Sequence, residues 1–186
     1  TAIIGLLFFY LFGAYEGIVN NALLELGMIN RPIIWFNNRF NGLTVIIIAS
    51  IWQNFGLNMV FFLAGLQSIP SEMYECADLD GASERTKFFS ITLPMLAPFA
   101  QKVLLLAMVG SFLIADLVIA MTYGGPAGKT DVMMSFIYKK FFKGVGVTFV
   151  RPEYGYASAL AFVAALIIGL MTLAYIRMSR RVNDLY

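Results

Sequence analysis

Long apolar stretches alternate with short polar ones along the chain, and the lengths of the apolar stretches predict membrane-spanning helices. A helix that crosses a bilayer needs about 20 mostly apolar residues. Three stretches are long enough, at residues 43–66, 99–121 and 157–176. A fourth, residues 2–14, is only part of a span, and we interpret it as the end of a truncated helix. The pattern therefore predicts a single all-α polytopic membrane domain with about four transmembrane helices.

The connections between these stretches contain shorter predicted elements. In GIVNNALLELGMI, apolar residues at helical spacing predict a short amphipathic helix that Asn20 or Asn21 caps and Gly27 stops. Before the last stretch, YGGPAGKT is typical of a turn. The following DVMMSFIYKKFF is typical of a helix at the membrane interface, with Lys139 and Lys140 extended toward the headgroups.

The connection 70–94 is much richer in charge than the stretches on either side of it. Asp80-Gly81 predicts a turn, because glycine adopts positive φ without a Cβ clash. One short helix precedes this turn, and a second, capped by Asp80 or Ser83, follows it and ends near Thr92. We therefore expect a polar hairpin of two short helices between two spans.

Composition supports the membrane interpretation and excludes several functions. The 186 residues are 60% hydrophobic and 13% charged, whereas globular proteins are about 45–50% apolar with about a quarter of their residues charged. The net charge is only +2, and no run of lysine or arginine is interleaved with aromatic residues, which argues against nucleic-acid binding. Histidine is absent and Cys76 is the only cysteine, which argues against an enzyme or a metal site and excludes an intrachain disulfide. Because the chain begins at Thr1 without a signal peptide, it resembles a piece of a longer polypeptide.

Lysine and arginine positions bear on orientation in the membrane. The cations on the hairpin side are Arg85, Lys87, Lys102, Arg177, Arg180 and Arg181. Those on the other side are Arg31, Arg39, Lys129, Lys139, Lys140, Lys143 and Arg151. The two sets are nearly equal, but charges close to a span end count most. The cluster at 177–181 therefore favours a cytoplasmic hairpin and C-terminus.

The hairpin also carries a motif. Glu75-Cys76-Ala77 is followed after three residues by Gly81, and after nine more by Ile91-x-Leu93-Pro94. This spacing resembles the EAA signature of ABC importer permeases, with cysteine where the second position is usually alanine. The stretches NMVFFLAGLQSIPSEMYECADLDGA, TYGGPAGKT, YGYASALAFV and GIVNNALLELG also resemble permeases of the maltose and glycerol-phosphate type. The resemblance covers about residues 17–181, and relative to the family's six spans the first two and the start of the third are missing.

The resemblance implies a machine with several partners. The hairpin would be a coupling helix that docks on a cytoplasmic ABC ATPase dimer, which would bind ATP and Mg²⁺, while this chain holds no cofactor. A second permease subunit, identical or related, and an extracytoplasmic solute-binding protein would complete the importer in a bacterial or archaeal inner membrane. The expected coupling residues are Glu75, Cys76, Ala77, Asp80, Gly81, Ile91, Leu93 and Pro94. Asp78 is expected to offer a further carboxylate to the ATPase.

Three polar residues in the apolar stretches are candidates for the solute path. Asn54 and Asn58 are one helical turn apart and share a face. They would either form interhelical hydrogen bonds or bind the hydroxyls of a solute. Asp116 is an acid within a predicted span and so is a candidate functional residue. The alternative is a structural role, in which Asp116 orders the turn at 123–126.

The expected function is the permease subunit of an ABC importer for a sugar or related polyol. The alternatives are the same machine with another solute, such as a peptide, polyamine or oxyanion, or a channel or membrane enzyme of another class. The chain has no G-x-x-x-x-G-K-[ST] loop, so ATP would be bound by a partner subunit.

Overall fold

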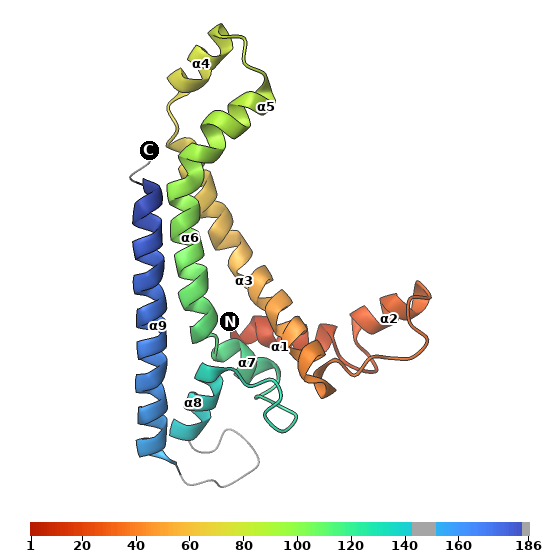
Figure 1. Cartoon of the computed structure of the whole chain (residues 1–186). Helices are drawn as coiled ribbons and strands as arrows, with labels where there is room; N and C mark the ends of the chain where they lie inside the picture. The colour runs from red at the N-terminus through yellow and green to blue at the C-terminus, as the bar shows by residue number, and fades with distance from the viewer. Residues whose placement is uncertain (143–151, 184–186) are drawn as a thin grey trace. The chain divides into compact units, whose positions relative to one another are not determined.

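A computed structural model of the chain describes residues 1–142 and 152–183, the last four by their backbone alone, and these residues form helices and no strands. The expected all-α fold is confirmed (Figure 1). The α-helices are α1 (Ala2–Leu11), α2 (Ile18–Glu25), α3 (Arg39–Gln67), α4 (Ser71–Leu79), α5 (Glu84–Lys87), α6 (Leu93–Leu113), α7 (Asp116–Met121), α8 (Met133–Phe141) and α9 (Tyr154–Asn183). Lys143 and Arg151 lie outside the described residues, as do the side chains of Arg180 and Arg181.

Three helical segments are long and apolar enough to cross a membrane, and α1 is a shorter apolar helix. The three segments are Arg39–Gln67, Glu84–Leu113 and Tyr154–Ser179. The chain itself buries few of their residues, at most 17% of the most apolar part of each. A helix that is apolar on all sides is surrounded by lipid or other protein. The structure thus agrees with a chain that passes the membrane several times.

The middle segment differs from the span expected at 99–121. It begins earlier and ends at Leu113, and residues 116–121 form the separate helix α7. The chain turns at Ile114 and Ala115 although neither residue is a helix breaker. The turn places Leu117 and Val118 in a buried contact with α1, and this burial explains why the apolar run is divided.

The chain divides into two compact units, residues 1–53 with 110–169, and residues 54–109 with the chain from residue 170 onward. The first unit has a core between α1, the first part of α3, and α7. Its buried members are Phe8, Phe12, Val45, Ile46, Ala49, Leu117, Val118 and Met121. Aromatic contacts extend this core, with Phe8 packed against Trp52 at 5.9 Å between ring centroids and Phe12 against Trp35 at 5.2 Å.

Asn20 connects the loops of the first unit and is not the helix cap that its sequence position suggested. Helix α2 begins after Gly17, so Asn20 lies inside the helix, where it is 1% exposed. Its amide nitrogen donates to the carbonyls of Gly13, Ala14 and Ile33 at 2.9–3.2 Å. Its amide oxygen accepts from the Ile33 N–H at 3.3 Å and from the Trp35 indole N–H at 3.0 Å. One side chain therefore ties the end of α1 to the segment before α3.

The predicted end of this helix is confirmed. Gly27 has a φ of +67°. Its N–H donates to the Leu24 carbonyl and the Met28 N–H donates to the Leu23 carbonyl, both at 3.0 Å. These two bonds form a Schellman cap, which requires the left-handed conformation that glycine adopts most readily.

Asp131, and not Asp116, orders the turn before α8. The Asp131 carboxylate lies against Gly124, forms an ion pair with Lys139, and accepts a hydrogen bond from the Ser135 hydroxyl at 3.1 Å. Lys139 also donates to the Tyr123 carbonyl at 3.4 Å, so its ammonium points into this turn and not toward lipid headgroups. Burial raises the pKa of the Tyr123 hydroxyl, and nearby Asp131 adds to this effect.

We expect the Asp131–Lys139 pair to stabilise the fold more than the neighbouring Lys140–Glu153 pair. The side chains of the first pair are 13% and 21% exposed, and those of the second are 44% and 26% exposed for the acid and the lysine. Asp131→Asn should lower the free energy of unfolding by about 1–3 kcal/mol, and the matched Glu153→Gln by about 0–1 kcal/mol. Denaturant unfolding of the full-length protein in detergent measures both. Equal losses would contradict the ranking.

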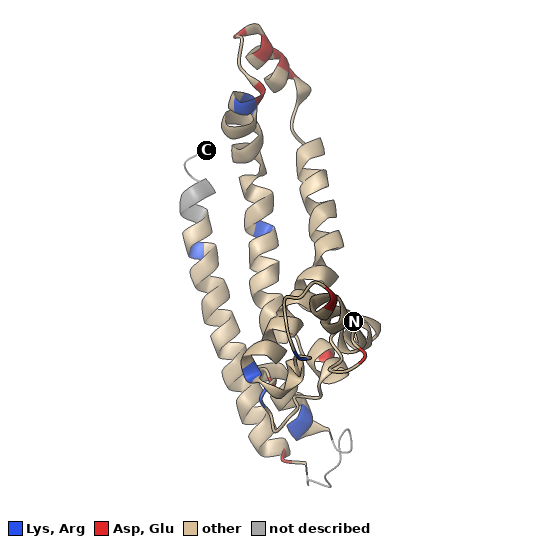
Figure 2. Ribbon diagram, turned by 90° about the vertical axis from the view of Figure 1, so that its right-hand side faces the viewer, with Lys and Arg blue, Asp and Glu red and all other residues tan. Residues whose placement is uncertain are grey.

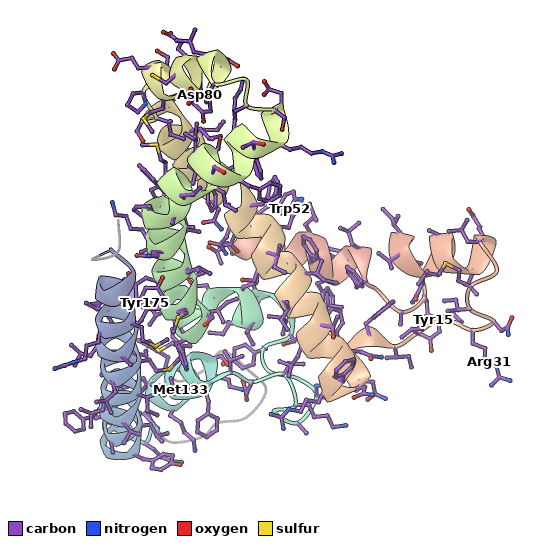
Figure 3. The ribbon with its side chains drawn as sticks, turned by 45° about the horizontal axis from the view of Figure 1, so that its top comes forward. Tyr15, Arg31, Trp52, Asp80, Met133 and Tyr175 are labelled. Carbon is purple, nitrogen blue, oxygen red and sulfur yellow. The ribbon has the colours of Figure 1, made fainter. Side chains whose placement is uncertain are left out.

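In the second unit, α6 contacts both of the other long helices. A Cβ added to Gly65 of α3 would lie 2.8 Å from Phe99, so glycine permits a close approach of α3 and α6. On another side of α6, the Tyr175 hydroxyl of α9 donates to the Gln101 carbonyl at 2.6 Å, and the Ser179 hydroxyl bonds to the Gln101 side chain. Tyr175 is labelled in Figure 3.

Candidate functional site

The hairpin formed by α4 and α5 is the part of the chain where acidic residues gather (Figure 2). Five of the chain's 11 acidic residues lie between residues 70 and 94, namely Glu72, Glu75, Asp78, Asp80 and Glu84. The predicted first helix is present as α4, and Glu72 lies in its first turn, where a carboxylate stabilises the positive end of the helix dipole. Helix α4 ends at Leu79, directly before the Asp80-Gly81 turn (Figure 3).

The predicted turn at Gly81 is confirmed. Gly81 has a φ of +71°. Its N–H donates to the Asp78 carbonyl at 3.0 Å, and the Ala82 N–H donates to the Ala77 carbonyl at 2.9 Å, which completes a Schellman cap on α4. Of the two caps expected for the following helix, Ser83 is the one used, because its hydroxyl accepts from the Thr86 N–H at 3.3 Å. Short-range signals in the sequence therefore determine this turn.

Two contacts across the turn close the hairpin. Lys87 forms ion pairs with Asp78 of α4 and with Glu84, the latter at 2.8 Å, and its side chain is only 10% exposed. The Tyr74 hydroxyl bonds to the Thr92 hydroxyl at 2.8 Å. Because these contacts join α4 to the segment after the turn, the hairpin has a defined shape of its own. Asp78 is paired within the chain, yet its side chain is still 60% exposed, and its contact with the ATPase stays a prediction.

The second arm of the hairpin is longer than expected. Residues Phe88–Thr92 form a π-helical stretch that joins α5 to α6, so this arm continues into the span and does not end near Thr92. Pro94 explains the wide turn, because in a regular α-helix its ring would press on the Ser90 carbonyl and its missing N–H would leave that carbonyl unpaired. The Thr92 hydroxyl donates to the Lys87 carbonyl at the same place, at 3.5 Å.

The predicted coupling residues fall into two groups by exposure. Glu75, Cys76, Asp80, Gly81 and Leu93 are exposed, and Ala77, Ile91 and Pro94 are half-buried. The outer face of α4 carries Glu72, Glu75, Cys76 and Leu79, which are spaced as one side of a helix.

Sequence reasoning missed the most exposed apolar side chain of the hairpin. Leu79 is 89% exposed at the end of α4, next to the exposed carboxylate of Asp80. Leu79 follows Glu75 by four residues, which is about one helical turn, and this spacing could have placed Leu79 on the same outer face as Glu75. Leu79 and Asp80 therefore place an apolar and an acidic side chain next to each other at the exposed end of α4.

The candidate path residues lie in different units. Asn54 and Asn58 are one turn apart on α3 in the second unit, where Asn54 is exposed and Asn58 half-buried. Asp116 is exposed in the first turn of α7, in the first unit. Within the described residues no cluster of three or more acidic or cysteine side chains has the arrangement of a metal site.

Curated relatives of this chain are transport permeases. The arabinooligosaccharides transport system permease protein AraP of Bacillus subtilis (strain 168) is 32% identical over 181 residues, which are 96% of this chain and 55% of that protein. The lactose transport system permease protein LacF of Rhizobium radiobacter is 34% identical over 159 residues, 84% of this chain and 51% of that protein. The multiple sugar-binding transport system permease protein MsmF of Streptococcus mutans serotype c is 36% identical over 139 residues, 73% of this chain and 46% of that protein. The chain thus spans about half the length of these relatives.

A solved structure has the same fold. The crystal structure of a bacterial ABC transporter involved in the import of the acidic polysaccharide alginate matches with a TM-score of 0.80 and 25% identity, over 96% of this chain and 60% of that chain. The family model described as binding-protein-dependent transport system inner membrane component matches residues 1–184. The predicted permease resemblance is confirmed, as is the expectation that the chain is not an enzyme. The chain belongs to the family of binding-protein-dependent transport system inner membrane components.

Proposed function

We propose that this chain is part of the transmembrane permease of an ABC importer that passes a sugar or related polyol inward, driven by ATP hydrolysis on a partner subunit. The similarity to permeases named for arabinooligosaccharides, lactose and multiple sugars supports a carbohydrate cargo. The observation that carries the ATP-driven mechanism is the closed acidic hairpin, which presents Leu79 and Asp80 on its outer surface.

The hairpin is the proposed contact with a cytoplasmic ABC ATPase dimer, which holds ATP and Mg²⁺. Leu79 would enter an apolar pocket of the ATPase, while Glu75 and Asp80 pair with basic groups at its rim. The Asp78–Lys87 pair would keep the two arms together, so that closure of the ATPase dimer moves the hairpin as a rigid body. On this proposal the hairpin and the C-terminus face the cytoplasm.

The remaining partners follow from the family. A solute-binding protein would deliver the cargo from outside, as the family description "binding-protein-dependent" implies. A second permease subunit, identical or related, would face this one. The exposed apolar surfaces of the three candidate spans supply the area for such a contact and for lipid.

The proposed solute path includes Asn54 and Asn58 of the second unit, whose amides would donate to and accept from sugar hydroxyls. Asp116 of the first unit is proposed by itself as an acceptor of a hydrogen bond from the solute. In this role the two amides face a solute. In the alternative role, in which they form interhelical hydrogen bonds, they would face another helix.

Uptake into vesicles tests the cargo and the path together. The full-length permease is reconstituted with its ATPase and binding protein, and ATP-dependent uptake of labelled arabino-oligosaccharides, lactose and a dipeptide is measured. We expect uptake of a sugar and no uptake of the dipeptide. Asn58→Ala should reduce sugar uptake severalfold without loss of complex assembly. Uptake of the dipeptide alone would refute the carbohydrate assignment, and uptake without ATP would refute an ABC mechanism.

A further inference from the structure

A groove in the second unit combines apolar walls with a lysine. Its walls are Phe61 of α3 and, from α6, Phe99, Lys102, Val103, Leu105 and Leu106, which together enclose about 310 Å³. We call this the Lys102 groove. Leu106 is 57% exposed and Phe61 38% exposed, so the groove is open on the surface of this chain.

Lys102 differs from the other lysines in its partners. Of the lysines that the structure describes, Lys87, Lys139 and Lys140 each pair with a carboxylate, and Lys129 donates to a backbone carbonyl at 3.3 Å. Lys102 forms no ion pair with any described residue, and its ammonium lies 5.4 Å from the centre of the Phe99 ring. A charge within a membrane-spanning segment is costly unless something compensates it.

The depth of Lys102 follows from its neighbour. Gln101 bonds to Tyr175 and Ser179, so this turn of α6 is level with the part of α9 that contains Arg177. At Arg177 the long apolar stretch of α9 ends. Because α9 changes there from apolar to cationic, Lys102 lies at the depth of a membrane interface and not at the bilayer centre.

We propose that the Lys102 groove binds one anionic glycerophospholipid, with the lipid phosphate on the Lys102 ammonium and an acyl chain along Phe61, Leu105 and Leu106. The cation at interface depth complements the phosphate, and the apolar walls complement the chain. A free sugar fits poorly, because Lys102 is the only polar side chain lining the groove. No residue that lines the groove belongs to the hairpin or to the proposed solute path.

Native mass spectrometry of the full-length, delipidated permease complex tests this proposal, with phosphatidylglycerol and phosphatidylcholine as probes. We expect one tightly bound phosphatidylglycerol per groove. Lys102→Gln should weaken its binding about fivefold relative to phosphatidylcholine, and Lys102→Arg should preserve it. Leu106→Trp, which fills the groove, should weaken both lipids. The control Lys140→Gln should change neither, because Lys140 is already paired with Glu153.

Several results would overturn the site. Unchanged phosphatidylglycerol preference in Lys102→Gln would show that the cation binds no lipid phosphate. Equal competition by soluble glycerol phosphate would indicate a free-phosphate site and not a lipid site. Lipid binding that appears only after the complex dissociates would show that another subunit covers the groove.

Discussion

Gly81→Pro is expected to abolish solute uptake while the permease still inserts into the membrane. Gly81 has a φ of +71°, and proline fixes φ near −65°. Proline also lacks the N–H that Gly81 donates to the Asp78 carbonyl at 3.0 Å. The turn therefore cannot form, and the Asp78–Lys87 contact across it should be lost. If the hairpin transmits ATPase closure, ATP hydrolysis should then become independent of solute delivery.

A matched control exists in the same chain. Gly27 has a φ of +67° and, like Gly81, closes a Schellman cap with no atom within 4 Å of an added Cβ. Gly27→Pro therefore introduces a comparable strain away from the hairpin, and solute-stimulated ATP hydrolysis should persist. Gly81→Ala, which adds about 1–2 kcal/mol of left-handed strain without removing the N–H, should have an intermediate effect. Normal uptake by Gly81→Pro would disprove the coupling role of this turn.

Asn20→Ala should be the most destabilising substitution in the first unit. The change removes five hydrogen bonds from a side chain that is 1% exposed and leaves the Trp35 indole N–H and the Ile33 backbone groups without their partner. A buried polar group without a partner costs about 1–3 kcal/mol. We therefore expect a loss of about 2–4 kcal/mol in the free energy of unfolding, measured by denaturant unfolding of the full-length protein in detergent.

The adjacent Asn21 is the control, because it is exposed on the same helix. Asn21→Ala should change the free energy of unfolding by about 0.5 kcal/mol or less. Hydrogen exchange should locate the effect of Asn20→Ala in residues 13–35, which its bonds connect. Similar stabilities for the two variants would show that the amide contacts contribute little.

Several features of the fold and candidate site were predictable from the sequence because they depend on neighbouring residues or on composition. The spans expected at 43–66 and 157–176 follow from the length of the apolar runs, since a bilayer requires about 20 apolar residues in a helix. The turns at Gly27 and Gly81 and the Ser83 cap follow from backbone chemistry within a few residues. The spacing of the motif at Glu75–Pro94, together with four further stretches of the sequence, predicted the family to which the chain belongs.

Other features depend on residues far apart in the chain. Nothing near Ala115 predicts the break between α6 and α7, which follows from the burial of Leu117 and Val118 against α1. Asn20 looks like a cap in the sequence, and only the approach of residues 33–35 makes it a buried connector.

Local hydrophobicity and backbone preference were enough to predict the long apolar helices, the turns at Gly27 and Gly81 and the polar hairpin, but not the break between α6 and α7. Which side chains are paired, exposed or left beside a groove follows only from the three-dimensional arrangement of the chain. Asp78 is paired with Lys87 across the turn, while Leu79 is exposed and Lys102 borders an open groove without a paired acid among the described residues. The physical reason is that pairing and burial depend on distances between segments, which local patterns do not specify.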